Sequence, residues 1–178
     1  MSLIKSIKKL IIFIITIILW PIKYIVPKGN IVILQCHSGL VYADNTKYLY
    51  EYLSTHTKYN VYWVTEQEVV IDYITRKGFK FISKKRIFHL IWVSLRTKVV
   101  IDSGDMYFNY FGLCDNHITT KICTMHGSGS KASHMRSDNI YKSIKPILQL
   151  NKFDYVNFTS EYSSHFVGKK LLLLPTKK

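Results

Sequence analysis

The sequence is poor in cysteine, and its cysteines lie far apart. Cys36, Cys114 and Cys123 are the only three in 178 residues, and they form no close pair. This number and spacing argue against a disulfide framework and against a zinc site, so we predict a reducing compartment and no metal-binding side chains. Internal repeats and low-complexity linkers are also lacking. The length then favours one ordinary domain with a sizeable core.

Acidic residues are scarce as well. The chain has 11 Asp and Glu against 25 Lys and Arg, which gives a net charge of +14. Such a balance predicts an anionic partner: a membrane phospholipid surface, a phosphorylated substrate or nucleic acid. No nucleic-acid-binding motif accompanies the many Tyr and Phe side chains, so nucleic acid is not expected as a partner. The hydrophobic fraction of 48% is typical of a folded protein.

The N-terminal segment is apolar and basic, and no carboxylate precedes Asp44. The uncharged run from Leu10 to Trp20 has about half of the roughly 20 residues that a membrane-spanning helix needs, although continuation beyond Pro21 approaches that length. Lysines flank the run on both sides, and no small-residue cleavage site follows it. We therefore predict that residues 1–28 form a membrane-associating helix, either spanning or lying among anionic headgroups. A buried core helix is the alternative.

After residue 28, short apolar runs alternate with helical patterns of spaced apolar residues. This alternation predicts an α/β fold, a Rossmann-like parallel sheet with helices on both faces, over residues 29–170. The predicted strands are 31–34, 60–65, 79–82, 98–101, 118–124 and 155–159. The predicted helices are 45–53, 67–77, 86–95, 138–150 and 161–169.

Ligands of such sheets bind beyond the carboxyl ends of the strands. The loops expected there are 35–44, 102–116 and 126–135, and we expect them to approach one another at one edge of the sheet. Polar residues collect in the loops of any protein, which is the alternative explanation for their presence here. The polar side chains of these loops and their borders are His37, Ser38, Asp44, Asn45, Asp102, Ser103, Asp105, His126, Ser128, Ser130, Lys131, His134 and Arg136.

The fifth predicted strand leads directly into Thr-Met-His-Gly-Ser-Gly-Ser-Lys, residues 124–131. Glycine lets the backbone approach an anionic group closely, and free N–H groups and hydroxyls bind phosphate oxygens. The imidazole of His126 can move a proton near neutral pH. The segment therefore indicates transfer of, or onto, a phosphate-bearing substrate, although such a turn also occurs as a plain flexible loop.

Three sequence blocks occur in a fixed order. They are Tyr-Ala-Asp-Asn-Thr-Lys-Tyr-Leu-Tyr-Glu-Tyr-Leu at 42–53, Val-Val-Ile-Asp-Ser at 99–103, and Lys-Ile-Cys-Thr-Met-His-Gly-Ser at 121–128 with Lys131 after it. Phe-Asp-Tyr at 153–155 and Thr-Ser-Glu-Tyr at 159–162 follow. Together these blocks resemble the CDP-glycerol glycerophosphotransferase family, whose members prime or polymerise teichoic acids and related glycerol-phosphate polymers.

The resemblance implies a GT-B architecture of two Rossmann-like domains, in which the second domain holds the nucleotide donor. That second domain is missing from this sequence. The resemblance therefore implies that the chain is the acceptor-side half of such an enzyme, a truncated form that is inactive alone, with residues 171–178 beginning the linker to the donor domain. Met125 stands where the family usually has Trp before the histidine.

The resemblance also implies an activity, the transfer of glycerol phosphate or a related polyol phosphate from CDP-glycerol to a lipid-linked acceptor. This reaction would take place at the cytoplasmic face of a bacterial membrane. His126 is the predicted general base that takes the proton of the acceptor hydroxyl. We predict that Asn45 recognises a hydroxyl and that Asp102 orients His126, with a helix cap or a strand-end cap as the alternative role. The other predicted substrate-binding residues are Ser103, Gly127, Ser128, Ser130 and Lys131.

No cofactor is predicted, and a divalent metal requirement stays open. His37 and His134 are expected to be solvated or structural. Two other functions also stay open. The first is a membrane-tethered module that binds polyanionic lipid or polymer without catalysis, and the second is a sugar-nucleotide glycosyltransferase of the same architecture.

Overall fold

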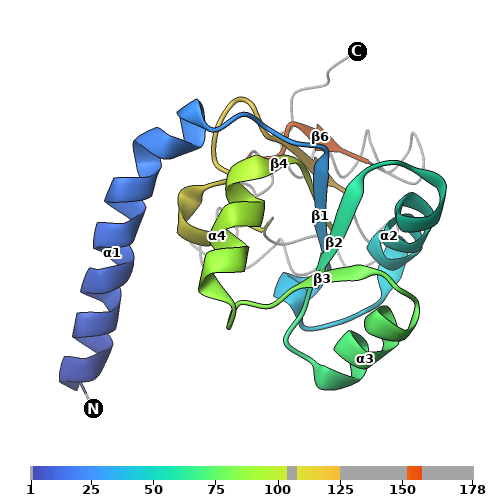
Figure 1. Ribbon diagram of the computed structural model, residues 1–178, viewed down its shortest axis with the longest axis horizontal. Helices are drawn as coiled ribbons and strands as arrows, with labels where there is room; N and C mark the ends of the chain where they lie inside the picture. The colour runs from blue at the N-terminus through green and yellow to red at the C-terminus, as the bar shows by residue number, and fades with distance from the viewer. Residues whose placement is uncertain (1, 104–107, 125–151, 158–178) are drawn as a thin grey trace, which may run out of the picture.

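The structure is a computed structural model that describes residues 2–103, 108–124 and 152–157. Its centre is a six-stranded sheet in which every neighbouring pair of strands is parallel. The strand order is β3-β2-β1-β4-β5-β6, so the chain first moves outward from β1 and then continues on the other side of it (Figure 1). The predicted α/β fold with a Rossmann-like parallel sheet is confirmed.

Each of the six predicted strands is present. They are β1 Ile31–Gln35, β2 Asn60–Val64, β3 Lys80–Ile82, β4 Thr97–Asp102, β5 Thr120–Cys123 and β6 Tyr155–Val156. The described helices are α1 Ser2–Ile25, α2 Asp44–His56, α3 Glu68–Arg76 and α4 Ile87–Arg96, with short 3-10 turns η1 His37–Gly39 and η2 Tyr110–Gly112. The predicted helices 138–150 and 161–169 lie outside the described residues.

The two faces of the sheet bury separate apolar clusters, because side chains alternate along each strand. Strand β1 contributes Ile33 to the first cluster and Leu34 to the second. The first cluster includes Leu90 of α4, whereas the second includes Tyr50 of α2 and Ile74 of α3. Helices therefore cover both faces of the sheet, as predicted.

Helix α2 continues past its predicted end at residue 53 and reaches His56. The Thr55 hydroxyl donates to the backbone carbonyl of Glu51 (2.9 Å), and the Thr57 hydroxyl donates to that of Leu53 (2.7 Å). Carbonyl groups in the last turn of a helix need such donors. The polar residues that make this segment look like a loop in sequence therefore stabilise an extra helical turn.

The predicted N-terminal helix is present as α1, which continues through Pro21. Its C-terminal end is fixed to the rest of the domain by Lys23, a buried side chain. Lys23 Nζ donates to the backbone carbonyls of Gly112 (3.2 Å) and Asp115 (2.8 Å), at and just after η2. Figure 1 shows the N-terminal part of α1 extending away from this attachment.

Most described side chains of α1 are exposed to solvent. The exposed fractions of Phe13, Ile17 and Trp20 are 61%, 56% and 58%. These values are incompatible with the buried core helix considered as an alternative. No helix within the described part of the chain combines the length and apolar character needed to cross a bilayer.

Glu51 joins α2 to α3 through three side chains. The hydroxyls of Tyr42 and Tyr73 donate to Glu51 Oε1 at 2.9 and 3.1 Å, and Lys77 Nζ lies 3.5 Å from Oε2. Burial of the carboxyl opposes its ionisation, but the two tyrosine hydrogen bonds and the lysine charge outweigh this and hold the pKa of Glu51 below its usual value. The carboxylate form is therefore the one that the fold favours.

Replacing Glu51 with glutamine is expected to destabilise the protein at pH 7 and to have less effect in acid. The folded-state pKa of Glu51 is depressed, so its contribution to stability is present above the unfolded pKa of about 4.3. This contribution is lost as the pH falls through the folded-state pKa. Urea unfolding of both proteins at neutral and acidic pH measures the difference. An equal loss of stability at both pH values would contradict the assignment.

Candidate functional site

The strand order reverses between β1 and β4, and the carboxyl ends of these strands lie side by side. Gln35 at the end of β1 is in register with Asp102 at the end of β4, and Asp102 is in turn in register with Cys123 of β5. The loops that leave a parallel sheet at such a reversal diverge and leave room for a ligand. Loops 35–44 and 102–116 therefore begin at one edge, as predicted.

The chain turns sharply after β1 into η1. His37 and Ser38 have positive φ angles of 45° and 59°, a left-handed conformation that is uncommon outside glycine. Gly39 follows with φ 84°, and a Cβ there would lie 2.9 Å from the carbonyl oxygen of Val64. Lys84 Nζ donates to the carbonyl of Ser38 (3.1 Å) and supports the turn. Such strained residues persist only when the surrounding structure holds them, and they cluster at functional sites.

Cys36 is fully buried at the end of β1 and is surrounded by polar groups. Its thiol donates to Asp44 Oδ2 across 3.9 Å. Burial raises the pKa of this thiol; hydrogen bonding with Ser103 and Thr46 lowers it, and the charges of Asp44 and Asp102 raise it further. The raised pKa keeps the thiol protonated near neutral pH, so Cys36 is not a ready nucleophile.

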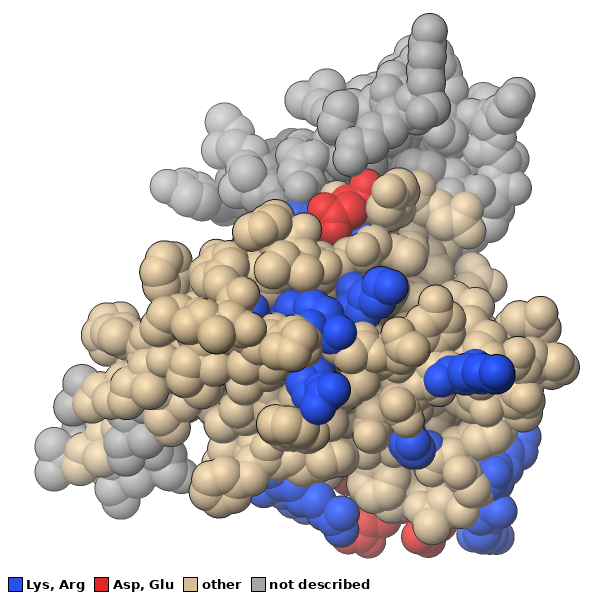
Figure 2. Space-filling model, turned by 45° about the horizontal axis from the view of Figure 1, so that its top comes forward, with Lys and Arg blue, Asp and Glu red and all other residues tan. Residues whose placement is uncertain are grey.

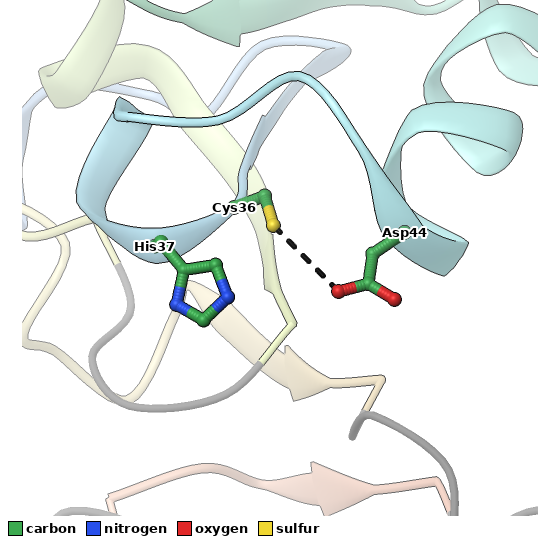
Figure 3. Close-up of side chains that lie close together, drawn as sticks. All are labelled: Cys36, His37 and Asp44. Carbon is green, nitrogen blue, oxygen red and sulfur yellow. Dashed lines mark hydrogen bonds between the residues drawn. The ribbon is translucent and has the colours of Figure 1, made fainter.

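His37 and Asp44 converge on the Cys36 thiol. Figure 3 shows the thiol reaching toward the carboxylate, with the imidazole ring beside them. The three potential ligand atoms, one from each side chain, lie within 4.8 Å of one another. His37 is exposed, Asp44 is half-buried and begins α2, and Asp44 also has a positive φ angle of 68°. The sequence analysis did not predict this group.

Two predicted substrate-binding residues, Asp102 and Ser103, are buried where β4 ends. The Asp102 carbonyl accepts hydrogen bonds from the Thr124 backbone N–H (2.8 Å) and hydroxyl (3.3 Å), which joins the end of β4 to the chain leaving β5. The hydrogen bond with Ser103 lowers the pKa of Cys36, and the charge of Asp102 raises it. The structure thus brings these two residues together with the turn that follows β1.

Asn45, a third predicted site residue, is exposed in the first turn of α2. The N-cap position belongs to Ala43, so the alternative role of Asn45 as the helix cap is wrong. Asn45 adjoins Asp44 and therefore borders the same edge of the sheet. The remaining predicted site residues lie outside the described part of the chain: His126, Gly127, Ser128, Ser130 and Lys131.

Lys84 is a residue at this edge that the sequence analysis missed. It follows β3, and besides its contact with Ser38 its backbone N–H donates to Glu66 Oε1. The Ser83 hydroxyl also donates to the Glu66 carboxylate (3.1 Å). The run Lys-Lys-Arg at 84–86, directly after the third predicted strand, is the sequence signal that points to a basic group at this edge.

A parallel sheet with this strand order defines a Rossmann-like α/β domain, a class whose ligands bind at the carboxyl edge where the order reverses. The sequence profile of the CDP-Glycerol:Poly(glycerophosphate) glycerophosphotransferases matches residues 18–170. The chain therefore belongs to this family, and the resemblance described above is confirmed.

Solved structures of the wall teichoic acid polymerase TagF share the fold. One has a TM-score of 0.62 and 14% sequence identity, over 98% of this chain and 46% of that chain. A TagF variant soaked with CDPG has a TM-score of 0.61 and 14% identity, over 83% of this chain and 37% of that chain. The chain thus spans less than half the length of these TagF chains. No curated protein matches the chain.

Proposed function

We propose that this chain is the acceptor-side domain of a glycerophosphotransferase. The whole enzyme would transfer glycerol phosphate, or a related polyol phosphate, from CDP-glycerol to a lipid-linked acceptor in the synthesis of teichoic acid or a related cell-surface polymer. The family match over residues 18–170 carries this proposal, because it includes β1, β4 and β5 and the His-Gly-Ser segment that follows β5.

In the proposed reaction His126 acts as the general base. Its imidazole takes the proton of the acceptor hydroxyl while the oxygen attacks the phosphorus that bears glycerol. A new P–O bond forms, the bond from that phosphorus to the CMP phosphate breaks, and CMP leaves. His126 follows Cys123 by three residues, and Cys123 is in register with Asp102. This short spacing from the carboxyl edge of the sheet supports the assignment.

The phosphate groups of the substrates need cationic and hydrogen-bonding partners. We assign this role to Lys131, Ser128 and Ser130, with Gly127 allowing close approach of the backbone. Asn45 and Ser103 are assigned to the acceptor hydroxyls. Lys84 supports the same chemistry, because its contact with Ser38 holds an ammonium group at this edge of the sheet.

The donor CDP-glycerol would bind mainly to a second domain in a GT-B arrangement. The chain spans less than half the length of the TagF chains, so a further domain is compatible with these relatives. No cofactor is assigned to the transfer reaction. The alternative within the same architecture is a sugar-nucleotide donor. It predicts that the nucleotide part of a sugar nucleotide is released, and that CMP is not released from CDP-glycerol.

We assign α1 to the surface of an anionic membrane, at its cytoplasmic face. Phe13, Ile17 and Trp20 recur at helical spacing and are all more than half exposed. An amphipathic helix of this kind lies in the interface, where apolar side chains enter the headgroup boundary and basic residues face anionic lipid. The face drawn in Figure 2 carries many Lys and Arg side chains and few Asp and Glu. Such a location places the chain at the surface where a lipid-linked acceptor is found.

Replacing Phe13, Ile17 and Trp20 together with serine is expected to lower binding to phosphatidylglycerol vesicles by at least about tenfold, because the apolar area that enters the bilayer is lost. Co-sedimentation of the 178-residue chain with vesicles measures the effect. The matched control is Val69→Ser on α3, which removes an exposed apolar side chain from another helix and is expected to leave binding unchanged. Equal binding by the triple variant would refute the assignment of α1.

The activity is tested with a fusion in which this chain replaces the corresponding part of TagF. The folded fusion, given CDP-glycerol and a lipid-linked acceptor, is expected to release CMP and to extend the acceptor. If the fusion binds CDP-glycerol yet releases no CMP, the proposed transfer is wrong and the alternative of a non-catalytic polyanion-binding module is favoured. If the fusion releases a nucleotide only from a sugar nucleotide, and not from CDP-glycerol, the glycosyltransferase alternative is favoured.

A further inference from the structure

We propose that Cys36, His37 and Asp44 form a binding site for a divalent metal ion of the zinc class. These residues provide one sulfur, one imidazole nitrogen and one carboxylate oxygen, and the three atoms lie within 4.8 Å of one another. Figure 3 shows the side chains arriving from the end of β1, from η1 and from the start of α2. This site is independent of the proposed transfer reaction, which assigns no role to Cys36 or His37.

The distances are close to those of a coordinated ion. Zinc binds sulfur at about 2.3 Å and nitrogen or oxygen at about 2.0–2.2 Å, so that ligand atoms around a tetrahedral ion lie roughly 3.3–3.7 Å apart. The Cys36 Sγ and Asp44 Oδ2 atoms are already 3.9 Å apart. The remaining separations, which reach 4.8 Å at most, must shorten by up to about 1.5 Å, and the ring that has to move belongs to His37, an exposed side chain.

The donor set selects the metal. Thiolate and imidazole are ligands for zinc and related transition metals, whereas magnesium and calcium prefer oxygen atoms alone. Binding replaces the thiol proton, which now points to Asp44, and releases it to solvent. The Cys36 thiolate and the Asp44 carboxylate then balance the two positive charges of the ion, so the buried end of β1 acquires no net charge.

The backbone holds the three ligands in place. His37 and Asp44 both have positive φ angles, 45° and 68°, although neither is glycine. Such left-handed conformations persist outside glycine only where the surrounding structure supports them. The turn is supported by Lys84, which donates to the Ser38 carbonyl, and by the close approach of Gly39 to Val64.

Three protein ligands are found among the described residues, and a tetrahedral ion takes four. Sites with three protein ligands keep one position for water or for an oxygen of a bound molecule. Cys36 directly follows Gln35, which is in register with Asp102, so the site borders the polar end of β4. The chemical class of ligand that fits there is a hydroxyl or phosphate oxygen.

The test is a cobalt titration of the complete 178-residue chain, because Co²⁺ replaces zinc and gives an absorption band when a thiolate binds it. We expect a band at one equivalent of Co²⁺ that is removed by competing Zn²⁺. Cys36→Ser is expected to abolish the band. Cys123→Ser, at another buried cysteine on the adjacent sheet strand β5, is expected to retain it. A band that survives Cys36→Ser, or no band with the folded parent chain, would overturn the site.

Two variants at the less buried ligands keep the test decisive if Cys36→Ser fails to fold. His37→Ala and Asp44→Asn are each expected to weaken Co²⁺ binding by at least about tenfold, since loss of even an outer-shell partner costs 10–100-fold. His56→Ala, at an exposed histidine at the other end of α2, is the matched control and is expected to bind like the parent. Unchanged affinity in both His37→Ala and Asp44→Asn would refute the site. The titration involves no CDP-glycerol, so its outcome is separate from that of the transfer reaction.

Discussion

Replacing His126 with alanine is expected to lower the rate of CMP release by about 10² to 10⁴-fold in the fusion in which this chain replaces the corresponding part of TagF. The reason is that a hydroxyl is a weak nucleophile at neutral pH, and a positioned general base contributes an acceleration of this size. The measurement is single-turnover release of CMP from CDP-glycerol in the presence of the lipid-linked acceptor. Vesicle binding through α1 is expected to stay unchanged, because it depends on other side chains.

The matched control is His134→Ala, which removes a second imidazole from the same segment of the chain. Because His134 has no assigned role in the reaction, this variant is expected to release CMP at the parental rate. A fusion carrying His126→Ala that still turns over at the parental rate would exclude His126 as the base. A loss of similar size in both variants would indicate damage to the segment as a whole.

The second large effect is expected for Trp63→Ala, which should lower the free energy of unfolding by about 3–5 kcal/mol. Trp63 lies on β2 and is fully buried. Its ring centroid is 4.8 Å from that of Tyr42 and 5.4 Å from that of Tyr50. Alanine would leave a cavity between β2 and α2 and would remove these aromatic contacts. Urea unfolding followed by circular dichroism measures the change.

Trp63→Phe is the control for the size of the cavity. The indole Nε1 is buried, and it has no hydrogen-bond partner among the described residues. Phenylalanine keeps an aromatic ring in the cluster and removes this unsatisfied donor, so its cost is expected to be clearly smaller than that of alanine. If alanine and phenylalanine destabilise the protein equally, or if alanine costs less than about 1 kcal/mol, the aromatic cluster does not stabilise the domain as described.

The strand order was not predicted, but the parallel sheet could be predicted from the sequence, because alternating strands and helices imply one. The apolar run Ile31–Leu34 shows this most clearly, since a strand that is buried on both faces has no polar side to alternate with. Boundaries were less predictable. Helix α2 continues to His56 because threonine hydroxyls satisfy its last carbonyls, and those threonines look like loop residues in sequence.

Of the candidate site, only the residues whose position follows from strand direction could be predicted from the sequence. Asp102 and Ser103 end a strand, so their place at the carboxyl edge followed from the fold class. The approach of Asp44 to Cys36 depends instead on left-handed backbone at His37 and Ser38. Neither residue is glycine, so the sequence does not predict this conformation. The membrane-associating role of residues 1–28 remains a prediction, whereas the helix itself was foreseeable from its long apolar run.

The position of β1 in the middle of the sheet has a consequence for biosynthesis. As the chain leaves the ribosome, β1 can pair with β2 early, and β2 with β3, but the other edge of β1 waits for Thr97–Asp102 to be made. Until then a hydrophobic strand with unpaired backbone groups is open to association with other nascent chains. Yield of native protein should therefore depend on how fast translation delivers β4, which makes slow growth at low temperature or chaperone supply a controlling factor in production.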